Sequence, residues 1–525
     1  MNSHCLRQDR LPGTSRLILD YAYRFDKLSA FYAHAPYAAD SMERAAELIR
    51  YPAERRTAMA RALELQNPGS PLIETLRQPD AVAVATGQQV GYLGGPAYTI
   101  FKALTAVRLT EQLQEKGIPA VPVFWLASED HDLAEVDHAW LFNGNRQPVR
   151  YQAETREESA APVGWRTAPP VRREELEATL AHLPFGTEVA KLAAETYREG
   201  QSYTQAFREL VERILGRHRV LFLDPMAPEI RALAAPLLAD AVEAFPQLAA
   251  SVSERSRALE TAGYHAQVHL EADTSYFFLL EEGQRLSLKF RQGAFFNGKR
   301  SWSAAEMGSR AAEISPNALL RPVVQDYLLP TVCLVGGPAE IAYLAQSAPI
   351  YERLLGRSPV FLPRAGFTLL DESAARHMER YGLTMPEFFT PEAAFVERLA
   401  KTRIPPELLS RMENTVGRAS ALFDEMRREL LAFDPTLAAA SERSQARVLY
   451  QFQKLERKTA REIARREERV QAEAAYLRGL VYPLKHLQER LYSFLPFLAA
   501  HGTGLVDVIH DSVHQDCPDH HVLVV

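Results

Sequence analysis

Polar side chains of the types that move protons directly follow an apolar run at residues 121–126. They are Ser128, Glu129, Asp130, His131 and Asp132. A short, continuous apolar run is typical of a buried parallel strand, and open α/β sheets bind ligands at the carboxyl ends of such strands. An imidazole between carboxylates suits general acid–base catalysis or metal binding. We therefore interpret Asp130 and His131 as catalytic candidates and Glu129 and Asp132 as binding candidates.

A helix N-cap explains part of the same segment. Ser128 is a favourable capping residue, and Glu129 and Asp130 would then occupy the first helical turn, where negative charge is stabilising. Capping gives no reason for His131, so we favour the functional interpretation of Asp130 and His131.

A glycine-rich segment follows a second apolar run, at residues 81–85. Its candidate binding residues are Thr86, Gly87, Gln88, Gln89, Gly94 and Gly95. Glycines after a strand let backbone N–H groups approach an anion, and a helix that opens near Pro96 directs its positive end there. Lys102, about two turns into that helix, is placed to reach a phosphate or carboxylate and is our third catalytic candidate. The segment matches neither GxGxxG nor a Walker A loop, and a tight connection without a ligand explains the glycines equally well.

A second Gly-Gly-Pro sequence follows the apolar run 328–335. It adds Gly336, Gly337 and Glu340 to the binding candidates. Two such turns on one sheet are expected to face each other across one crevice, although Glu340 also suits the first turn of a helix. Arg321 and Arg364 flank the same strands, but each taken singly is more typical of a surface residue.

Histidines and a cysteine are concentrated near the C-terminus. They are His510, His514, Cys517, His520 and His521. Their spacing permits a metal site, but the alternating run 521–525 is also typical of a terminal strand. We favour the strand and leave the metal unknown.

The elements that carry these residues form an alternating pattern. An apolar run, a helical period over 97–116 and the run 121–126 make one βαβ unit. Similar apolar runs occur at 220–223, 328–335 and 360–362, so we expect one open parallel sheet interrupted by inserts. Residues 265–296 alternate as a small antiparallel ribbon does.

Later residues are strongly helical. A helix is expected over 407–433, and residues 437–478 contain no glycine or proline and carry apolar residues at coiled-coil spacing. We interpret the charged residues between them as the solvated face of an antiparallel hairpin. The seam itself must be covered, by a partner helix or a second subunit.

Composition limits the class of protein. The 525 residues predict about three domains, and 47% hydrophobic with 24% charged residues excludes a mainly disordered chain. A net charge of −6 argues against a general nucleic-acid binder. Three dispersed cysteines, no apolar leader and no long apolar run predict a cytoplasmic protein without a membrane span.

The motifs together resemble those of the BshC family, the cysteine-adding enzymes of bacillithiol biosynthesis. The matching residues are Thr86-Gly87-Gln88-Gln89, Gly94-Gly95-Pro96, Lys102, Phe124-Trp125, Glu129-Asp130-His131-Asp132 and Gly336-Gly337-Pro338. The resemblance covers nearly the whole chain. It implies an α/β fold with a Rossmann-type parallel sheet core and inserted connecting regions, and an α-helical coiled-coil domain that pairs two subunits.

These expectations give the following domains: an N-terminal helical segment packed on the core over 1–80; the core over 81–385, with inserts at about 150–215 and 265–310; the coiled-coil domain over 386–482; and a segment returning to the core over 483–525.

The resemblance also implies a reaction. Cysteine is joined through its carboxyl group to the amine of glucosaminyl-malate, the last step in making bacillithiol. A carboxylate must be activated before an amine displaces its oxygen, so a nucleotide, ATP or ADP, is chemically reasonable. The chain lacks the His-x-Gly-His and Lys-Met-Ser-Lys-Ser motifs of class I aminoacyl-tRNA synthetases, whose fold the family shares. The mode of activation therefore stays open. The alternatives are a nucleotidylyltransferase acting on another small acid and a nucleotide-regulated coiled-coil interaction protein.

Overall fold

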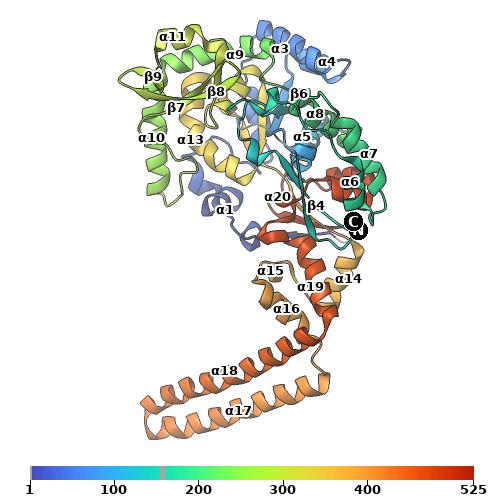
Figure 1. Ribbon diagram of the computed structural model, residues 1–525. Helices are drawn as coiled ribbons and strands as arrows, with labels where there is room; N and C mark the ends of the chain where they lie inside the picture. Colours follow the sequence, from blue (N-terminus) through green and yellow to red (C-terminus); the bar gives the residue numbers. More distant parts are fainter. Residues whose placement is uncertain (1–2, 154–159, 299) are drawn as a thin grey trace.

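A computed structural model describes residues 3–153, 160–298 and 300–525 (Figure 1). Residues 1 and 2 of the predicted N-terminal segment, and 154–159 and 299 of the two predicted inserts, lie outside the described residues.

A five-stranded parallel sheet forms the centre of the molecule. Its order is β13 (Val360–Pro363), β12 (Thr331–Gly336), β2 (Val82–Gln88), β3 (Ala120–Leu126) and β6 (Leu221–Leu223). The chain enters at β2, builds β3 and β6 on one side, and later returns to place β12 and β13 on the other. The order therefore reverses between β2 and β12, the kind of position at which open parallel sheets bind ligands. This confirms the predicted parallel core.

The two faces of the sheet are covered by different helices, because successive strand residues point to opposite sides. Phe124 and Leu126 of β3 pack in one core with α5 (Tyr98–Glu115) and α8 (Tyr203–Leu215). Val123 and Trp125 pack in the other, with α3 (Ala53–Gln66), α9 (Pro228–Glu243) and α13 (Pro338–Leu355). Every residue of β3 is buried, which accounts for its continuous apolar sequence.

Two sets of elements are inserted between the parallel strands. The first contains the hairpin of β4 (His138–Phe142) and β5 (Pro148–Gln152), followed by α6 (Arg173–Leu180), α7 (Gly186–Thr196) and α8. The second contains α10 (Phe245–Thr261) and an antiparallel sheet. That sheet has the order β10 (Arg300–Ser303), β9 (Ala294–Asn297), β8 (Gln284–Arg291), β7 (Thr274–Glu281) and β11 (Ile314–Pro316). It confirms the predicted ribbon.

The N-terminal segment differs from the expected helices in two places. Residues 3–6 form β1 (Ser3–Leu6), which pairs with β15 (His520–Val524), so both chain ends lie side by side (Figure 1). The expected helical segment also contains a break between α2 (Ser41–Glu47) and α3. Pro52 is extended at the start of α3, and a residue that precedes proline avoids the helical region, so the chain breaks there. Helices α1 (Arg16–Tyr23) and α4 (Leu72–Arg77) complete the segment.

The C-terminal part combines a small sheet with a helical hairpin. Strand β14 (Gly366–Leu370) pairs with β15, and α14 (Glu372–Tyr381), α15 (Met385–Phe388) and α16 (Glu392–Lys401) follow it. Helices α17 (Pro406–Phe433) and α18 (Pro435–Arg466) then form an antiparallel hairpin that projects from the body (Figure 1). The single run predicted over 437–478 is interrupted at Glu467, where α19 (Glu468–Val481) begins, although the sequence contains no helix breaker there.

The chain then returns to the body through α20 (Gln488–Leu491), α21 (Leu495–His501) and α22 (Gly504–Asp511). Among the described helices, none is both long enough and apolar enough for a transmembrane segment.

Candidate active site

A cavity of about 1450 Å³ opens at the carboxyl ends of β2, β3 and β12, where the strand order reverses. The predicted candidates that line it are Gly87, Gln88, Gln89, Lys102, Glu129, Asp130, His131, Asp132, Gly337 and Glu340. The segments that follow β2, β3 and β12 therefore meet at one cavity, but the Gly94-Gly95 turn, which was expected to face Gly336-Gly337 across it, is not part of the lining. Its volume exceeds the roughly 300–1,000 Å³ of a typical small-molecule pocket, which leaves space for more than one ligand.

Four other predicted binding residues do not line the cavity: Thr86, Gly94, Gly95 and Gly336. Thr86 lies inside its strand, where its hydroxyl donates to the carbonyl of Val335 at 2.9 Å. Gly94 is buried beside Leu210 of α8, and its N–H points to the Tyr197 hydroxyl at 3.4 Å. Gly94 and Gly95 have φ of 83° and 65°, a backbone conformation that favours glycine. The two glycines are therefore explained by the backbone turn that they form.

The ammonium group of Lys102 binds partners within the chain. The side chain is 3% exposed and forms an ion pair with Glu340. It also donates to the carbonyl of Gly87 at 2.9 Å and to Oε1 of Gln88 at 3.1 Å. An ammonium group has three N–H donors, so these contacts use all of them. The expected free cation is instead a clamp between the segments that follow β2 and β12.

Glu340 is held in its charged form by the same clamp. Burial acts to raise its pKa, but Lys102 and the N–H of Gly337, which donates at 2.7 Å, outweigh burial, and the pKa lies below its usual range. Burial lowers the pKa of Lys102, and Glu340 opposes that effect.

The polar segment after β3 forms a turn. Oδ1 of Asp130 accepts from the N–H of His131 at 2.7 Å and of Asp132 at 3.4 Å, the arrangement of an Asx turn. The Ser128 hydroxyl donates to Oδ1 of Asp224 at 2.5 Å instead of capping a helix. The N-cap alternative is therefore wrong, and the carboxylate of Asp130 is fixed at the cavity wall.

His131 lies beside Arg285, a residue that the sequence analysis missed. Nη1 of Arg285 is 3.2 Å from Nδ1 of His131, and the guanidinium stacks 3.7 Å from the centre of the Phe278 ring. Arginine only donates, so Nδ1 of His131 accepts, and a neutral imidazole then carries its proton on Nε2. His131 thus offers an N–H donor. Arg285 comes from the antiparallel insert, more than 150 residues from His131, and no local motif marks it.

Glu129 is the most enclosed carboxylate of the segment. It is 6% exposed, and its Oε1 is 3.2 Å from Nη1 of Arg231. Burial raises the pKa of Glu129, which Arg231 only partly opposes. A carboxylate in a cavity wall with a raised pKa is typical of a general acid or base.

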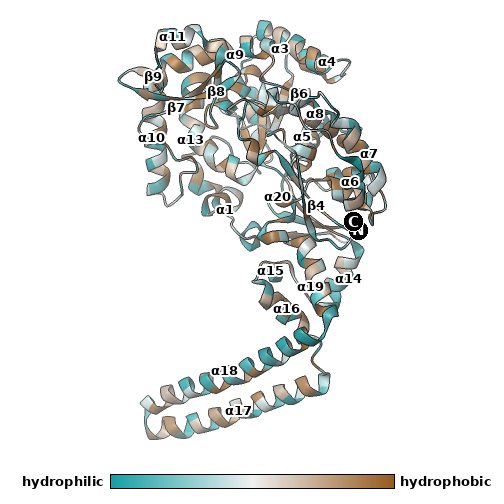
Figure 2. Ribbon diagram, viewed as in Figure 1, coloured by the Kyte–Doolittle hydropathy of each residue, from teal (hydrophilic) through white to brown (hydrophobic). Residues whose placement is uncertain are grey.

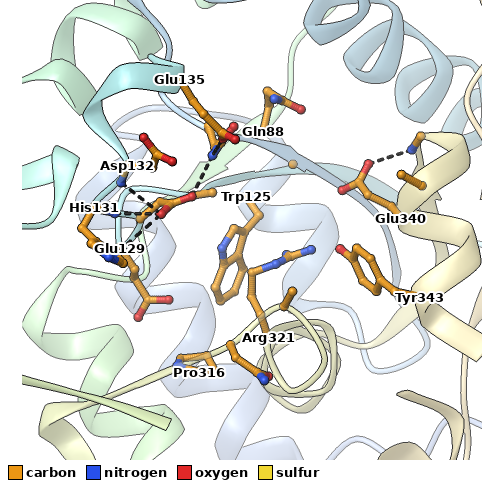
Figure 3. A pocket seen from close by; sticks show the side chains of 18 of the residues that line it. Gln88, Trp125, Glu129, His131, Asp132, Glu135, Pro316, Arg321, Glu340 and Tyr343 are labelled. Atoms are coloured by element: carbon orange, nitrogen blue, oxygen red, sulfur yellow. Dashed lines mark hydrogen bonds and ion pairs between the residues drawn. The ribbon is translucent and has the colours of Figure 1, made fainter. Parts of the chain in front are cut away.

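The opposite end of the cavity is rich in arginine. Arg321, Arg364 and Arg490 line it, together with Tyr343. Figure 3 shows Trp125 between the group of Glu129 and His131 and the group of Arg321, Tyr343 and Glu340. The preference for Arg321 and Arg364 as surface residues is therefore wrong. Arg364 is 4% exposed and forms two hydrogen bonds, of 2.8 and 2.7 Å, to the carboxylate of Glu489.

Fold and site together define a class of α/β protein with a Rossmann-like sheet, a polar cavity at its switch point and a helical appendage. Family models identify the particular family. The model of the BshC N-terminal Rossmann-like domain of bacillithiol biosynthesis matches residues 1–365, and that of the BshC C-terminal coiled-coil domain matches residues 367–525. The two matches meet earlier than the limit we predict at 386.

Curated relatives cover the same length. A protein of Solibacter usitatus, named "Putative cysteine ligase BshC", is 49% identical over 100% of both chains. A protein of Koribacter versatilis with the same name is 35% identical over 99% of both chains. The chain belongs to the BshC family, which confirms the resemblance and the fold class given by its motifs.

Proposed function

We propose that this chain forms the amide bond between the carboxyl group of cysteine and the amine of glucosaminyl-malate, giving bacillithiol. The observation that carries the proposal is the 49% identity, over the full length of both chains, with a relative named for cysteine ligation. The relatives' name supplies the reaction, and the cavity supplies a place for it.

The charges of the cavity are compatible with these substrates. The malate part of glucosaminyl-malate carries two carboxylates, which suit Arg321 and Arg490. Cysteine and the sugar each carry an amine, which suits the carboxylates of Glu129 and Asp130 at the other end. We place the malate part at the arginine end and the reacting amine near Glu129.

In this arrangement each group at the reacting end has a task. Glu129 accepts a proton from the amine as the new C–N bond forms and a C–O bond of the activated carboxyl breaks. Nε2–H of His131 donates to the carbonyl oxygen on which negative charge develops. Arg285 holds His131 in the tautomer that can donate.

A nucleotide, ATP or ADP, is our proposal for the activating group. The cavity volume leaves space for one beside the substrates. However, Lys102 and the N–H of Gly337, which we expected to hold phosphate, contact Glu340 instead. We therefore assign no phosphate contact.

The reaction is tested by incubating the purified full-length chain with cysteine and glucosaminyl-malate, with and without ATP and a divalent metal, and identifying products by mass spectrometry. Formation of bacillithiol supports the proposal. Pyrophosphate release with no thiol product, under any of these conditions, would support a nucleotidylyltransferase instead.

We further propose that two copies pair through the α17–α18 hairpin. Leu422, Met426 and Phe433 are 64%, 54% and 83% exposed, and their spacing of four and seven places them on one side of α17. Hydrophobic residues recur along this projecting helix (Figure 2). An exposed apolar stripe of this kind needs a covering surface, and the same stripe on a second copy supplies one.

A further inference from the structure

Two buried histidines lie at the edge of the parallel sheet opposite the cavity. His218 comes just before the first residue of β6, and His510 belongs to α22. They are 6% and 5% exposed, and their ring centres are 4.2 Å apart. The predicted C-terminal cluster is thus divided. His520 and His521 belong to β15, as expected of a terminal strand, whereas His510 meets residues distant in sequence.

Carboxylates surround the pair. Oε2 of Glu111 is 2.9 Å from Nε2 of His510, and Oδ1 of Asp511 is 3.0 Å from Nδ1 of the same ring. Oδ1 of Asp507 is 2.7 Å from Nε2 of His218. A neutral imidazole has one N–H, so it can donate to only one of two carboxylates. One of the two carboxylates at His510 therefore faces a ring nitrogen that carries no N–H, and a metal ion between them would satisfy both groups.

We propose that Glu111, His218 and His510 bind a divalent transition-metal ion of the Zn²⁺ type. Their donor atoms lie within 4.8 Å of one another and come from α5, the loop before β6 and α22. Imidazole and carboxylate are preferred Zn²⁺ ligands at about 2.0–2.2 Å, so the donor atoms must draw together. The Glu111 side chain is 37% exposed, which permits that movement.

Asp511 provides an independent observation. Metal-binding histidines usually donate their second ring N–H to a carboxylate, which fixes the tautomer and strengthens the metal bond. His510 has this arrangement, with Nε2 toward Glu111 and Nδ1 toward Asp511. Asp507 contacts one ring nitrogen of His218, with its Oδ1 2.7 Å from Nε2. Two arginines balance the remaining charge: Arg108 is 3.3 Å from Glu111, and Arg217 is 2.9 Å from Asp507.

The ion would join the two parts of the chain. Glu111 and His218 belong to the residues matched by the Rossmann-like model, and His510 belongs to those matched by the coiled-coil model. Because the site lies at the amino edge of the sheet and the cavity at the carboxyl edge, its role is structural. It stabilises the contact of α22 with α5.

The test uses the full-length chain without an affinity tag. Zn²⁺ affinity is measured by calorimetric titration, retained metal by elemental analysis, and thermal unfolding with and without Zn²⁺. We expect one ion per chain in the wild type and a higher unfolding temperature with Zn²⁺. His218→Asn and His510→Asn should lose the ion, whereas His265→Asn, an exposed histidine elsewhere, should keep it.

The variant Asp511→Asn tests the site without disturbing the fold, because the Asp511 side chain is 73% exposed. We expect a 10- to 100-fold loss of Zn²⁺ affinity, the usual cost of removing an outer partner of a ligating histidine. A wild-type chain that binds no Zn²⁺, or variants at His218, His510 and Asp511 with wild-type affinity, would overturn the proposal. The cluster would then be a network of hydrogen bonds and ion pairs without a metal ion.

Discussion

Lys102 of α5 and Glu340 of α13 form an ion pair between the helices that follow β2 and β12. These strands are neighbours in the sheet although more than 240 residues separate their first residues. The pair therefore closes the wall of the cavity at the point where the strand order reverses. It also engages the ammonium group of Lys102, a predicted catalytic residue, with partners inside the chain.

Replacing Lys102 by Met should destabilise the protein. The Glu340 carboxylate would stay partly buried without its partner, at a cost of about 3 kcal/mol. Urea unfolding measures the loss. Lys116→Met, at the exposed end of the same helix region, should cost less than about 1 kcal/mol. A Lys102→Met protein as stable as wild type, yet inactive, would instead assign Lys102 to ligand binding.

Replacing His131 by Ala should remove activity without unfolding the protein. The side chain is 39% exposed, so stability should change by less than about 1 kcal/mol. Bacillithiol formation should fall by about 10²-fold or more, the usual value for a lost catalytic donor. Mass spectrometric product assays and thermal unfolding, with His265→Ala as the matched control, separate the two effects. Full activity of His131→Ala would refute its role.

The acid limb of the pH profile should report Glu129. A general base works in its ionised form, and burial raises the pKa of Glu129 above the ordinary 4.5. The value of kcat/KM should therefore fall, as the pH is lowered, at a pH above 4.5. Glu129→Gln should abolish this limb together with most of the activity. An unchanged profile in Glu129→Gln would exclude Glu129 as the base.

The ionisation of Glu129 should favour activity but disfavour the folded state. The folded state holds the proton more tightly than the unfolded chain, so Glu129 favours folding below its unfolded pKa and loses that contribution as the pH rises through the folded pKa.

Arg364 and Glu489 should be essential for joining the C-terminal segment to the core. Both side chains are almost fully buried, so Arg364→Met should cost about 3–5 kcal/mol by leaving Glu489 unpaired. Arg364→Lys should not restore stability, because lysine cannot form the two parallel bonds. Thermal unfolding of both variants is the measurement, and wild-type stability of Arg364→Lys would contradict the two-bond interpretation.

The same pair should make stability depend on acid pH. Burial acts to raise the pKa of Glu489, but Arg364 outweighs it and the pKa is lowered. The contribution to stability is therefore present above the unfolded value near 4.5 and is lost as the pH falls through the folded pKa.

The hairpin should determine the oligomeric state. We expect a dimer in light scattering of the wild type, and a monomer for the double variant Leu422→Glu, Met426→Glu, because charge on the apolar stripe opposes its burial. Glu425→Lys, at an exposed position between them, should remain dimeric. A monomeric wild type, or a dimeric double variant, would contradict pairing through α17.

Local patterns were sufficient to predict the parallel strands and the polar segment after β3. The continuous apolar run at 121–126 directly reflects a strand buried on both faces. Arg285, Arg231 and Glu489 were missed because each approaches the cavity residues from a distant segment, and a single sequence does not reveal such pairing.

The errors in the site have a common physical cause. Glycines after a strand and a lysine in the following helix are typical of an anion-binding site. Here Gly94 and Gly95 instead adopt the positive φ that a backbone turn requires, and Lys102 pairs with the carboxylate of Glu340. The helix break at Glu467 has no signal in the local sequence.

The most direct measurement of the central claim compares bacillithiol formation by the wild type, Glu129→Gln, His131→Ala and His265→Asn under the conditions that support turnover. We expect product with the wild type and His265→Asn, and at least about 10²-fold less with the two cavity variants. Thermal unfolding transitions like that of the wild type should show that all the variants are folded. Wild-type rates in both Glu129→Gln and His131→Ala would show that the bond is formed elsewhere.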